Sequence, residues 1–308
     1  MTAPRKTQHR GTAQKKRRLP STPARRLDMT QVMEWKDGSV SKLDDYLVGE
    51  EPLEIRLGAR PINVTMRTPG HDLELAAGFL FTEGVIRGGD DIARMSQPAN
   101  RQKHNVVRVN LRAGVNIDAA RLQRHFVSTS SCGLCGKTSI DAVRVRGIAR
   151  PNPGLRFAPD MLCLLPDALR SNQTLFGRTG GPHAAGLFDA SGTLIVLRED
   201  VGRHNALDKL VGWALVEGRL PLSHHIVMVS GRSSFEILQK SLMAGAPMVC
   251  AVSAPSSLAV ALAREFGLTL VGFLRGERFN VYTGLERVRV TVPAGEGPSA
   301  VARGAGDV

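Results

Sequence analysis

Two cysteines separated by two residues are the strongest chemical signal in the sequence. Cys132 and Cys135 stand in the segment Ser131-Cys-Gly-Leu-Cys-Gly-Lys137, after a serine- and threonine-rich stretch that predicts an exposed loop. A Cys-x-x-Cys pair supports metal binding, dithiol redox exchange, or the carriage of sulfur as a persulfide. The spacing alone leaves these three chemistries open.

The three chemistries make different demands on the rest of the chain. Structural zinc usually takes four nitrogen or sulfur ligands. The sequence has neither a second Cys-x-x-Cys nor a His-x-x-x-His spacing, so zinc would need distant partners. Thioredoxin-like exchange favours a pair beside a βαβ unit rather than in a polar loop. A persulfide carrier needs an accessible thiolate, which the positive charge of Lys137 would favour.

Polar residues also follow three predicted strands, where helices are expected to begin. These junctions are residues 199–205, 230–234 and 253–257. Parallel strands would bring them to one edge of a sheet, where helix N-termini offer N–H groups to anions. Gly231 permits close backbone approach, and Arg203 and Arg232 could clamp phosphate oxygens. We predict a phosphate-bearing ligand, although Ser and Gly also serve simply as caps and turn residues.

A predicted turn over residues 272–280 carries Arg275 and Arg278 toward the same edge. These arginines would form a second basic surface at that edge. The alternative is a solvent-exposed turn that contacts no ligand. His183 and His204 could act as acid–base groups or metal ligands, but a lone histidine more often orients a neighbour.

The pattern of apolar and polar residues differs between the two halves of the chain that must position these residues. In the first half, alternating residues predict a hairpin over 53–57 and 62–66, a helix from Leu73 to about Gly84, and strands at 106–111 and 142–145. In the second half, apolar runs alternate with amphipathic stretches, as in a largely parallel sheet covered on both faces. The strands expected there are 194–197, 226–229, 248–252 and 268–274, and the helices are 200–213, capped by Asp200, then 234–243 and 258–266.

The basic charge is concentrated at the N-terminus. The 308 residues carry a net charge of +13. Residues 1–27 hold nine basic side chains, no acidic one and few large apolar residues, which leaves +4 for the rest of the chain. We predict a disordered arm, because such a segment cannot bury enough surface to fold. No apolar run follows Arg17-Arg18 as a targeting signal would require. The expectation is a soluble, cytoplasmic protein with no membrane partner. The arm would be a solvated tail or a weak contact for nucleic acid or an acidic partner.

Four cysteines are too few for a secreted disulfide framework. Cys163 and Cys250 lie in apolar runs and are predicted to be inert core thiols.

Several segments together resemble one family, the formate dehydrogenase accessory sulfurtransferase FdhD. They are residues 128–137, 179–185, 199–210, 230–240 and 270–283, and with the hairpin they span most of residues 50–285. The run Glu-Asp-Val-Gly-Arg-His-Asn-Ala-Leu-Asp-Lys, from Glu199 to Lys209, is too long for chance agreement.

The resemblance implies a function. The protein would accept sulfur from a cysteine desulfurase as a persulfide on Cys132, with Cys135 assisting. It would then transfer that sulfur to the bis-molybdopterin guanine dinucleotide molybdenum cofactor, bound as substrate, before the cofactor enters formate dehydrogenase. The nucleotide arms would supply the phosphates that the junctions predict. The expected cofactor-binding residues are Phe273, Leu274, Arg275, Gly276, Glu277, Arg278, Arg203, His204, Ser230, Gly231, Arg232 and Ser233.

The resemblance also implies an α/β class, with a cytidine deaminase-like three-layer α/β/α C-terminal domain and a smaller α+β N-terminal region. The expected divisions are a disordered basic arm over 1–27, the α+β region over 28–150, the deaminase-like domain over 151–290 and a flexible tail over 291–308. The zinc signature of the deaminases is absent from the sequence, so deamination gains no support. A homodimer is expected, since two copies would offer two nucleotide sites to one double-armed cofactor. The alternative function is a non-catalytic cofactor-binding chaperone with a zinc or redox-sensing Cys pair.

Overall fold

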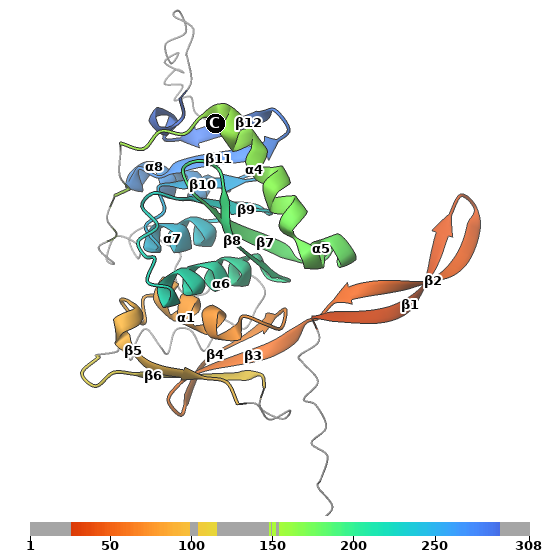
Figure 1. The fold of residues 1–308 in the computed structure, drawn as a ribbon, viewed down its shortest axis with the longest axis horizontal. Helices are drawn as coiled ribbons and strands as arrows, with labels where there is room; N and C mark the ends of the chain where they lie inside the picture. The colour runs from red at the N-terminus through yellow and green to blue at the C-terminus, as the bar shows by residue number, and fades with distance from the viewer. Residues whose placement is uncertain (1–25, 99–103, 116–147, 149, 152–153, 290–308) are drawn as a thin grey trace, which may run out of the picture.

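The described part of the chain forms two sheets and one projecting ribbon. The computed structural model describes residues 26–98, 104–115, 148, 150–151 and 154–289. A six-stranded sheet lies above a four-stranded sheet, and a two-stranded ribbon extends from the side of the body (Figure 1).

The six-stranded sheet has the order β12-β11-β10-β9-β7-β8. Strands β9, β10 and β11 pair in parallel, whereas β7 pairs antiparallel with both β9 and β8, so β8 also runs parallel to β9. Strand β12 is antiparallel to β11. The bounds are β7 (His183–Phe188), β8 (Leu194–Asp200), β9 (Ile226–Val229), β10 (Met248–Ala251), β11 (Thr269–Arg275) and β12 (Arg278–Thr283).

Helices cover both faces of this sheet because alternate strand residues belong to different cores. Val227 and Val229 pack in one core with α6, α7 and α8, whereas Ile226 and Met228 pack in another with α4. The helix bounds are α4 (Pro159–Asn172), α5 (Thr174–Thr179), α6 (Arg203–Val216), α7 (Phe235–Met243) and α8 (Ser257–Phe266).

The four-stranded sheet supports α1, which packs on α6. Its order is β4-β3-β6-β5. Glycine allows the two helices to approach closely: a Cβ on Gly78 would lie 1.8 Å from the Asp208 carbonyl oxygen, and one on Gly212 would lie 1.8 Å from that of Glu74. The bounds are β3 (Glu51–Leu57), β4 (Arg60–Arg67), α1 (Asp72–Thr82), η1 (Gly89–Asp91), β5 (Ile92–Ser96), β6 (Val106–Leu111) and η2 (Leu285–Arg287).

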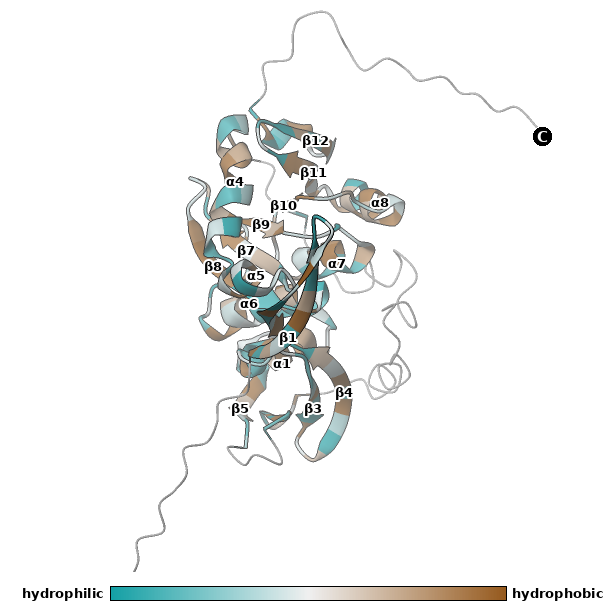
Figure 2. Cartoon of the chain, turned by 90° about the vertical axis from the view of Figure 1, so that its right-hand side faces the viewer, coloured by the Kyte–Doolittle hydropathy of each residue, from teal (hydrophilic) through white to brown (hydrophobic). Residues whose placement is uncertain are grey.

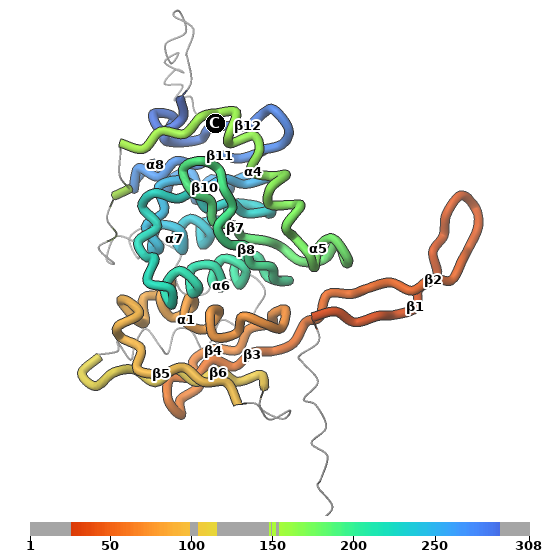
Figure 3. The backbone as a smooth tube through the Cα atoms, viewed as in Figure 1, coloured from red at the N-terminus to blue at the C-terminus, as the bar shows by residue number. Residues whose placement is uncertain are grey.

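The ribbon consists of β1 (Leu27–Lys36) and β2 (Ser39–Val48), which pair antiparallel along their whole length. The tube in Figure 3 shows it leaving the body beside α5 and β3 and ending in a free tip. Nothing in the sequence patterns discussed above predicted it.

Most predicted elements are confirmed, with small shifts at their ends, and so is the mixed α/β class. One correction concerns Asp200, which ends β8 and accepts a hydrogen bond from the Gly202 N–H, while Gly202 is the N-cap of α6. The elements that the sequence did not predict are β1, β2, β5, β7, β12, α4, α5 and the short helices η1 and η2. The predicted strand 142–145, the tail 291–308 and nearly all of the basic arm lie outside the described residues.

No helix within the described ranges is long and apolar enough to cross a membrane.

Candidate functional site

The three polar junctions do lie along one edge of the six-stranded sheet, as predicted. Strands β8, β9 and β10 run in parallel, and their carboxyl ends therefore share that edge. Backbone hydrogen bonds also join two of the loops: the Ser233 N–H donates to the Ala254 carbonyl at 3.2 Å, and the Ser256 N–H donates to the Ser233 carbonyl at 3.0 Å. The edge is thus a continuous surface rather than three separate turns.

Strand β7 enters at this edge and brings His183 into it. The Ser230 hydroxyl accepts a hydrogen bond from the Ala184 N–H at 2.9 Å, which fixes the loop after β9 against the start of β7. A Cβ on Gly231 would lie 3.2 Å from His183 Nδ1 and 4.0 Å from Arg203 Cδ. The absence of a side chain at Gly231 therefore lets the loop lie directly on these two residues.

Two polar atoms at this edge are buried without a hydrogen-bond partner among the residues that the structure describes. They are Nε of Arg203 and Oγ of Ser233, whose residue is 0% exposed. Buried polar atoms nearly always have partners, so an unpaired donor at a loop edge requires an explanation. An acceptor for either atom would have to come from outside the residues that the structure describes.

Positive charge dominates the surroundings of these atoms. Burial, and then the nearby charges of Arg203, His204 and Arg232, lower the pKa of His183. His204 lies 3.0 Å from the Glu236 carboxylate and 3.3 Å from the Ser234 hydroxyl. His183 is therefore neutral at pH 7 and can donate or accept one hydrogen bond, and an anion entering the edge meets guanidinium groups.

The N-termini of two helices also remain available to an anion. No side chain caps α6 or α7, so their first N–H groups lack the partner that a Ser or Asp cap would supply. In α8, by contrast, the Ser256 hydroxyl accepts the Ala259 N–H at 3.3 Å. Of the three N-termini, those beside Arg203 and Ser233 are thus the open ones.

The turn between β11 and β12 lies beside the loop after β10. The Phe273 N–H donates to the Ser253 carbonyl at 3.2 Å, with Phe273 at φ 52°, and Arg275 Nε donates to the Val252 carbonyl at 3.2 Å. Arg275, Gly276, Glu277 and Arg278 are exposed, whereas Leu274 is 0% exposed and belongs to the core against α4. The turn thus offers its arginines to the edge, while the Leu274 side chain packs inside.

Much of the run from Glu199 to Lys209 has a structural role. The Glu199 carboxylate accepts the N–H groups of Leu175 and Phe176 at 2.9 and 2.8 Å, at the start of α5. Asp200 forms a buried ion pair with Lys209 at 2.6 Å. Arg203 and His204 in this run instead lie beside His183, Gly231 and Ser234 at the edge.

The sequence gives little or no signal for two residues of the edge. His183 stands in the sequence as an isolated histidine, because no local pattern places it beside Gly231. Glu236 was missed altogether, since one Glu on an amphipathic helix carries no signal. The tertiary structure places both beside Arg203 or His204.

The cysteines divide between described and undescribed parts of the chain. Cys132 and Cys135 lie outside the described residues. Cys250 is fully buried in β10, and burial raises the pKa of its thiol, as expected for an inert core residue. Cys163 is only partly buried on α4, which corrects the prediction of a core position; burial, and then Asp160, raise the pKa of its thiol. Within the described ranges, no group of three or more His, Cys, Asp or Glu side chains could hold a metal ion.

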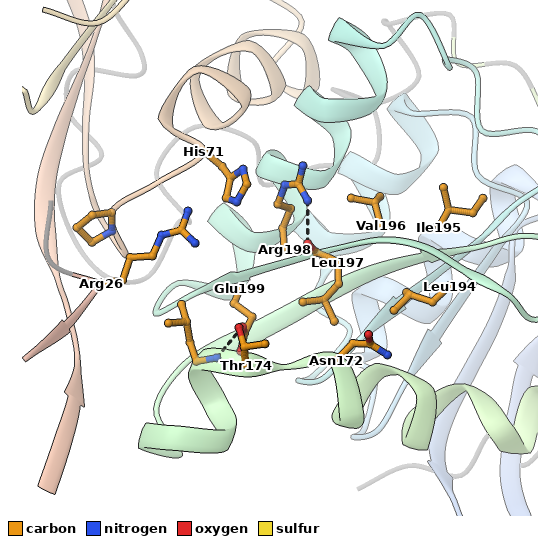
Figure 4. Close-up of a pocket in the computed structure, with 12 residues that line it drawn as sticks. Arg26, His71, Asn172, Thr174, Leu194, Ile195, Val196, Leu197, Arg198 and Glu199 are labelled. Atoms are coloured by element: carbon orange, nitrogen blue, oxygen red, sulfur yellow. Dashed lines mark hydrogen bonds between the residues drawn. The ribbon is translucent and has the colours of Figure 1, made fainter. Parts of the chain in front are cut away.

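A cavity of about 330 Å³ lies along β8, from Leu194 to Glu199 near its carboxyl end. Figure 4 shows Arg26, His71, Asn172 and Thr174 around the strand from Leu194 to Glu199. None of the predicted cofactor-binding residues lines it.

Comparison with known proteins gives consistent matches over most of the chain. The model of the FdhD/NarQ family matches residues 48–289. The sulfur carrier protein FdhD of Streptomyces coelicolor is 53% identical over 274 residues, which cover 87% of this chain and 97% of the relative. The protein of the same name from Sulfurisphaera tokodaii is 44% identical over 248 residues, 80% of this chain and 92% of the relative.

A solved structure agrees with these sequence matches. A crystal structure from Desulfotalea psychrophila, described as that of a formate dehydrogenase accessory protein, superposes with a TM-score of 0.68 at 27% sequence identity. The similarity covers 85% of this chain and 99% of that one.

Proposed function

Since this chain belongs to the FdhD/NarQ family, we propose that it is a cytoplasmic sulfurtransferase that serves formate dehydrogenase. It accepts sulfur from a cysteine desulfurase on Cys132 and transfers that sulfur to the bis-molybdopterin guanine dinucleotide molybdenum cofactor. Relatives named sulfur carrier protein FdhD support the first half of this proposal. The cytidine deaminase-like layering of the C-terminal half remains a prediction.

The proposed binding of the molybdenum cofactor is supported by two buried atoms that have no hydrogen-bond partner in the described chain, Arg203 Nε and Ser233 Oγ. Both are hydrogen-bond donors, and both lie where two uncapped helix N-termini add further N–H groups. Such an arrangement suits the diphosphate of a guanine nucleotide arm, whose oxygens accept several hydrogen bonds at once. Arg232, Arg275 and Arg278 are exposed around it and would neutralise the remaining charge.

The sulfur half rests on the spacing of the two thiols. The Cys132 thiolate attacks the terminal sulfur of the desulfurase persulfide, forming one S–S bond as the donor's S–S bond breaks and its thiolate leaves. Cys135 then attacks the inner sulfur of Cys132, which releases the outer sulfur as sulfide for the molybdenum. The two thiols thereby become a disulfide, which supplies the two electrons, and a dithiol reductant restores them.

A homodimer belongs to this proposal. One copy of the edge provides one set of phosphate-binding groups, and the cofactor has two nucleotide arms. Two copies related by a twofold axis would present two equivalent sets.

Intact-mass spectrometry after incubation with a cysteine desulfurase and cysteine tests the sulfur half. We expect a reducible gain of one sulfur atom in the native chain and in Cys135→Ala, and no gain in Cys132→Ala. Cys163→Ala is the matched control, since it removes a partly exposed thiol outside the pair. Arg232→Ala should also keep the gain, because it alters only the anion-binding edge.

The opposite result has a clear meaning. If no form gains sulfur and zinc is found bound in the native chain but not in Cys132→Ala, the protein is a cofactor-binding chaperone and the sulfurtransferase proposal is wrong.

A further inference from the structure

Strand β8 has one free backbone edge, and a cavity runs along it. It is the last strand of the six-stranded sheet, so no strand of the described chain pairs with its outer side. The cavity of about 330 Å³ is lined by every residue from Leu194 to Glu199. Successive side chains of a strand point to opposite faces of the sheet. A cavity that touches six consecutive residues therefore follows the edge of the strand rather than one of its faces.

An extended peptide is the ligand that fits such an edge. The outward N–H and C=O groups of an edge strand can pair with the backbone of an added strand. This contact needs polar groups rather than an apolar groove, and the side chains of Asn172 and Thr174 also line the cavity. Figure 2 shows β8 at the margin of the sheet, hydrophobic along its first part and hydrophilic toward its carboxyl end. The six lining residues extend over about 20 Å, which a peptide of about six residues would match.

The charges at the carboxyl end of β8 leave one positive group without a partner. The Glu199 carboxylate accepts two backbone N–H groups at the start of α5. The Arg198 guanidinium pairs with the Glu74 carboxylate of α1. No acidic side chain of the described chain pairs with Arg26, which lines the same end of the cavity. An anionic group is therefore the electrostatic complement of this end.

The loop before α1 holds Arg26 and His71 at the cavity. A Cβ on Gly70 would overlap Arg26 Nη2, so the guanidinium lies directly against this glycine. His71 has φ 58°, a left-handed conformation that costs free energy for a residue with a side chain. Its Nδ1 lies 3.3 Å from the Glu74 carboxylate. Figure 4 shows both side chains at the end of the cavity that Arg198 forms, with Leu194 at the other end.

We propose that β8 binds the C-terminal segment of a partner protein as an added parallel strand, with the terminal carboxylate between Arg26 and His71. A strand added parallel to β8 ends at the carboxyl end of β8, where the unpaired guanidinium lies. Charge-assisted hydrogen bonds to a carboxylate then fix the end of the peptide, and backbone hydrogen bonds fix its length. This inference does not depend on sulfur transfer, because none of the residues proposed to bind the molybdenum cofactor lines the cavity.

Affinity capture from a defined peptide mixture tests this site. The full-length chain is immobilised and exposed to random hexapeptides with a free C-terminal carboxylate, mixed with the same set amidated at the C-terminus. Mass spectrometry of the bound fraction should show the free acids enriched at least about tenfold over the amides, because the amides lack the charged acceptor. Arg26→Ala should abolish this preference. Arg87→Ala is the matched control: it removes an arginine side chain that is 86% exposed, away from the cavity, and should keep the preference.

Hydrogen–deuterium exchange separates strand addition from a contact at Arg26 alone. With an enriched peptide bound, amides within residues 194–199 should exchange at least about tenfold more slowly, and those of α8 should not change. His71→Gly should fold as stably as the native chain, since glycine adopts φ 58° without strain, and should bind the peptide several-fold more weakly. Unchanged exchange along β8 overturns the added strand, and equal capture of acids and amides overturns the carboxylate site.

A chain that lacks residues 290–308 tests a competing occupant, the protein's own C-terminus. We expect this shortened chain and the full-length chain to bind an enriched peptide with equal affinity in a fluorescence anisotropy titration. A higher affinity of the shortened chain means that its own C-terminal residues fill the site, and the assignment to a partner protein is then wrong.

Discussion

The interface between α1 and α6 and the edge of the six-stranded sheet use the same stretch of sequence in opposite ways. At the interface, buried charges are paired: Asp200 with Lys209 at 2.6 Å and Asp208 with Lys240 at 2.8 Å. At the edge, Arg203 Nε and Ser233 Oγ are buried without partners in the described chain. Asp200 and Arg203 are only three residues apart.

This difference separates structural residues from ligand-binding ones. A buried charge that has its partner in the folded chain needs nothing from a ligand, and removing the partner costs stability. A buried donor without a partner already costs stability, and a ligand can recover that cost on binding. Substitutions in the two regions should therefore have opposite effects on stability and on binding.

The largest effect is expected at the buried ion pair. Lys209→Met leaves the Asp200 carboxylate without its charge partner, and we expect a loss of about 3 to 5 kcal/mol in the free energy of unfolding. Urea denaturation followed by circular dichroism measures it. Lys36→Met, at the exposed tip of the ribbon, is the control and should change stability little. If the two variants proved equally stable, the pair would not hold the interface together.

The next effect depends on pH and involves the contact between α1 and β8. The Arg198 guanidinium lies 2.5 Å from the Glu74 carboxylate. Burial acts to raise the pKa of Glu74, but hydrogen bonds from Arg198 and His71 lower it to about 2, from an ordinary value of 4.5. A lowered pKa in the folded state means that the stabilisation is present above pH 4.5 and is lost as the pH falls toward 2.

Glu74→Gln should therefore destabilise the protein by about 1 to 2 kcal/mol at pH 7, and the difference from the native chain should shrink across that acid range. Urea titrations at a series of pH values measure this difference. Glu217→Gln, at the exposed end of α6, should track the native chain. A constant difference between the native chain and Glu74→Gln at all pH values would contradict the linkage.

The smallest effect should have the opposite sign. Ser233→Ala removes a buried hydroxyl that has no partner in the described chain, so the unliganded protein should be as stable as the native chain or more stable by about 1 kcal/mol. Its affinity for GDP, used as a probe of the nucleotide arm and measured by calorimetry, should fall by about tenfold.

Ser241→Ala is the matched control for that substitution. The Ser241 hydroxyl is equally buried but donates to the Ile237 carbonyl at 2.8 Å, so its removal should lower stability by about 1 kcal/mol and leave GDP affinity unchanged. Unchanged GDP affinity in Ser233→Ala would remove the hydroxyl from the proposed anion site.

The sequence predicted the second half of the fold well because its elements are defined locally. A strand that is covered on both faces is apolar at every position, so runs such as 226–229 and 248–252 are recognisable as buried strands from the sequence alone. Strand β7 was harder to recognise, since Gly186 and its small neighbours give little β signal. The ribbon was missed because its alternation is interrupted by Gln31, Lys42 and Asp44 on the apolar face.

The sequence by itself determined the family, the position of the thiol pair, and the junctions that share one edge, because a motif and a strand–helix rhythm are properties of neighbouring residues. Only the tertiary structure decided which residues of the 199–209 run are paired and which are not. Partners such as Met66 in β4 and Thr68 in the loop before α1 lie more than a hundred residues away in the sequence. Whether a buried polar atom has a partner depends on distant segments that meet only in the folded chain, and a local pattern cannot encode that.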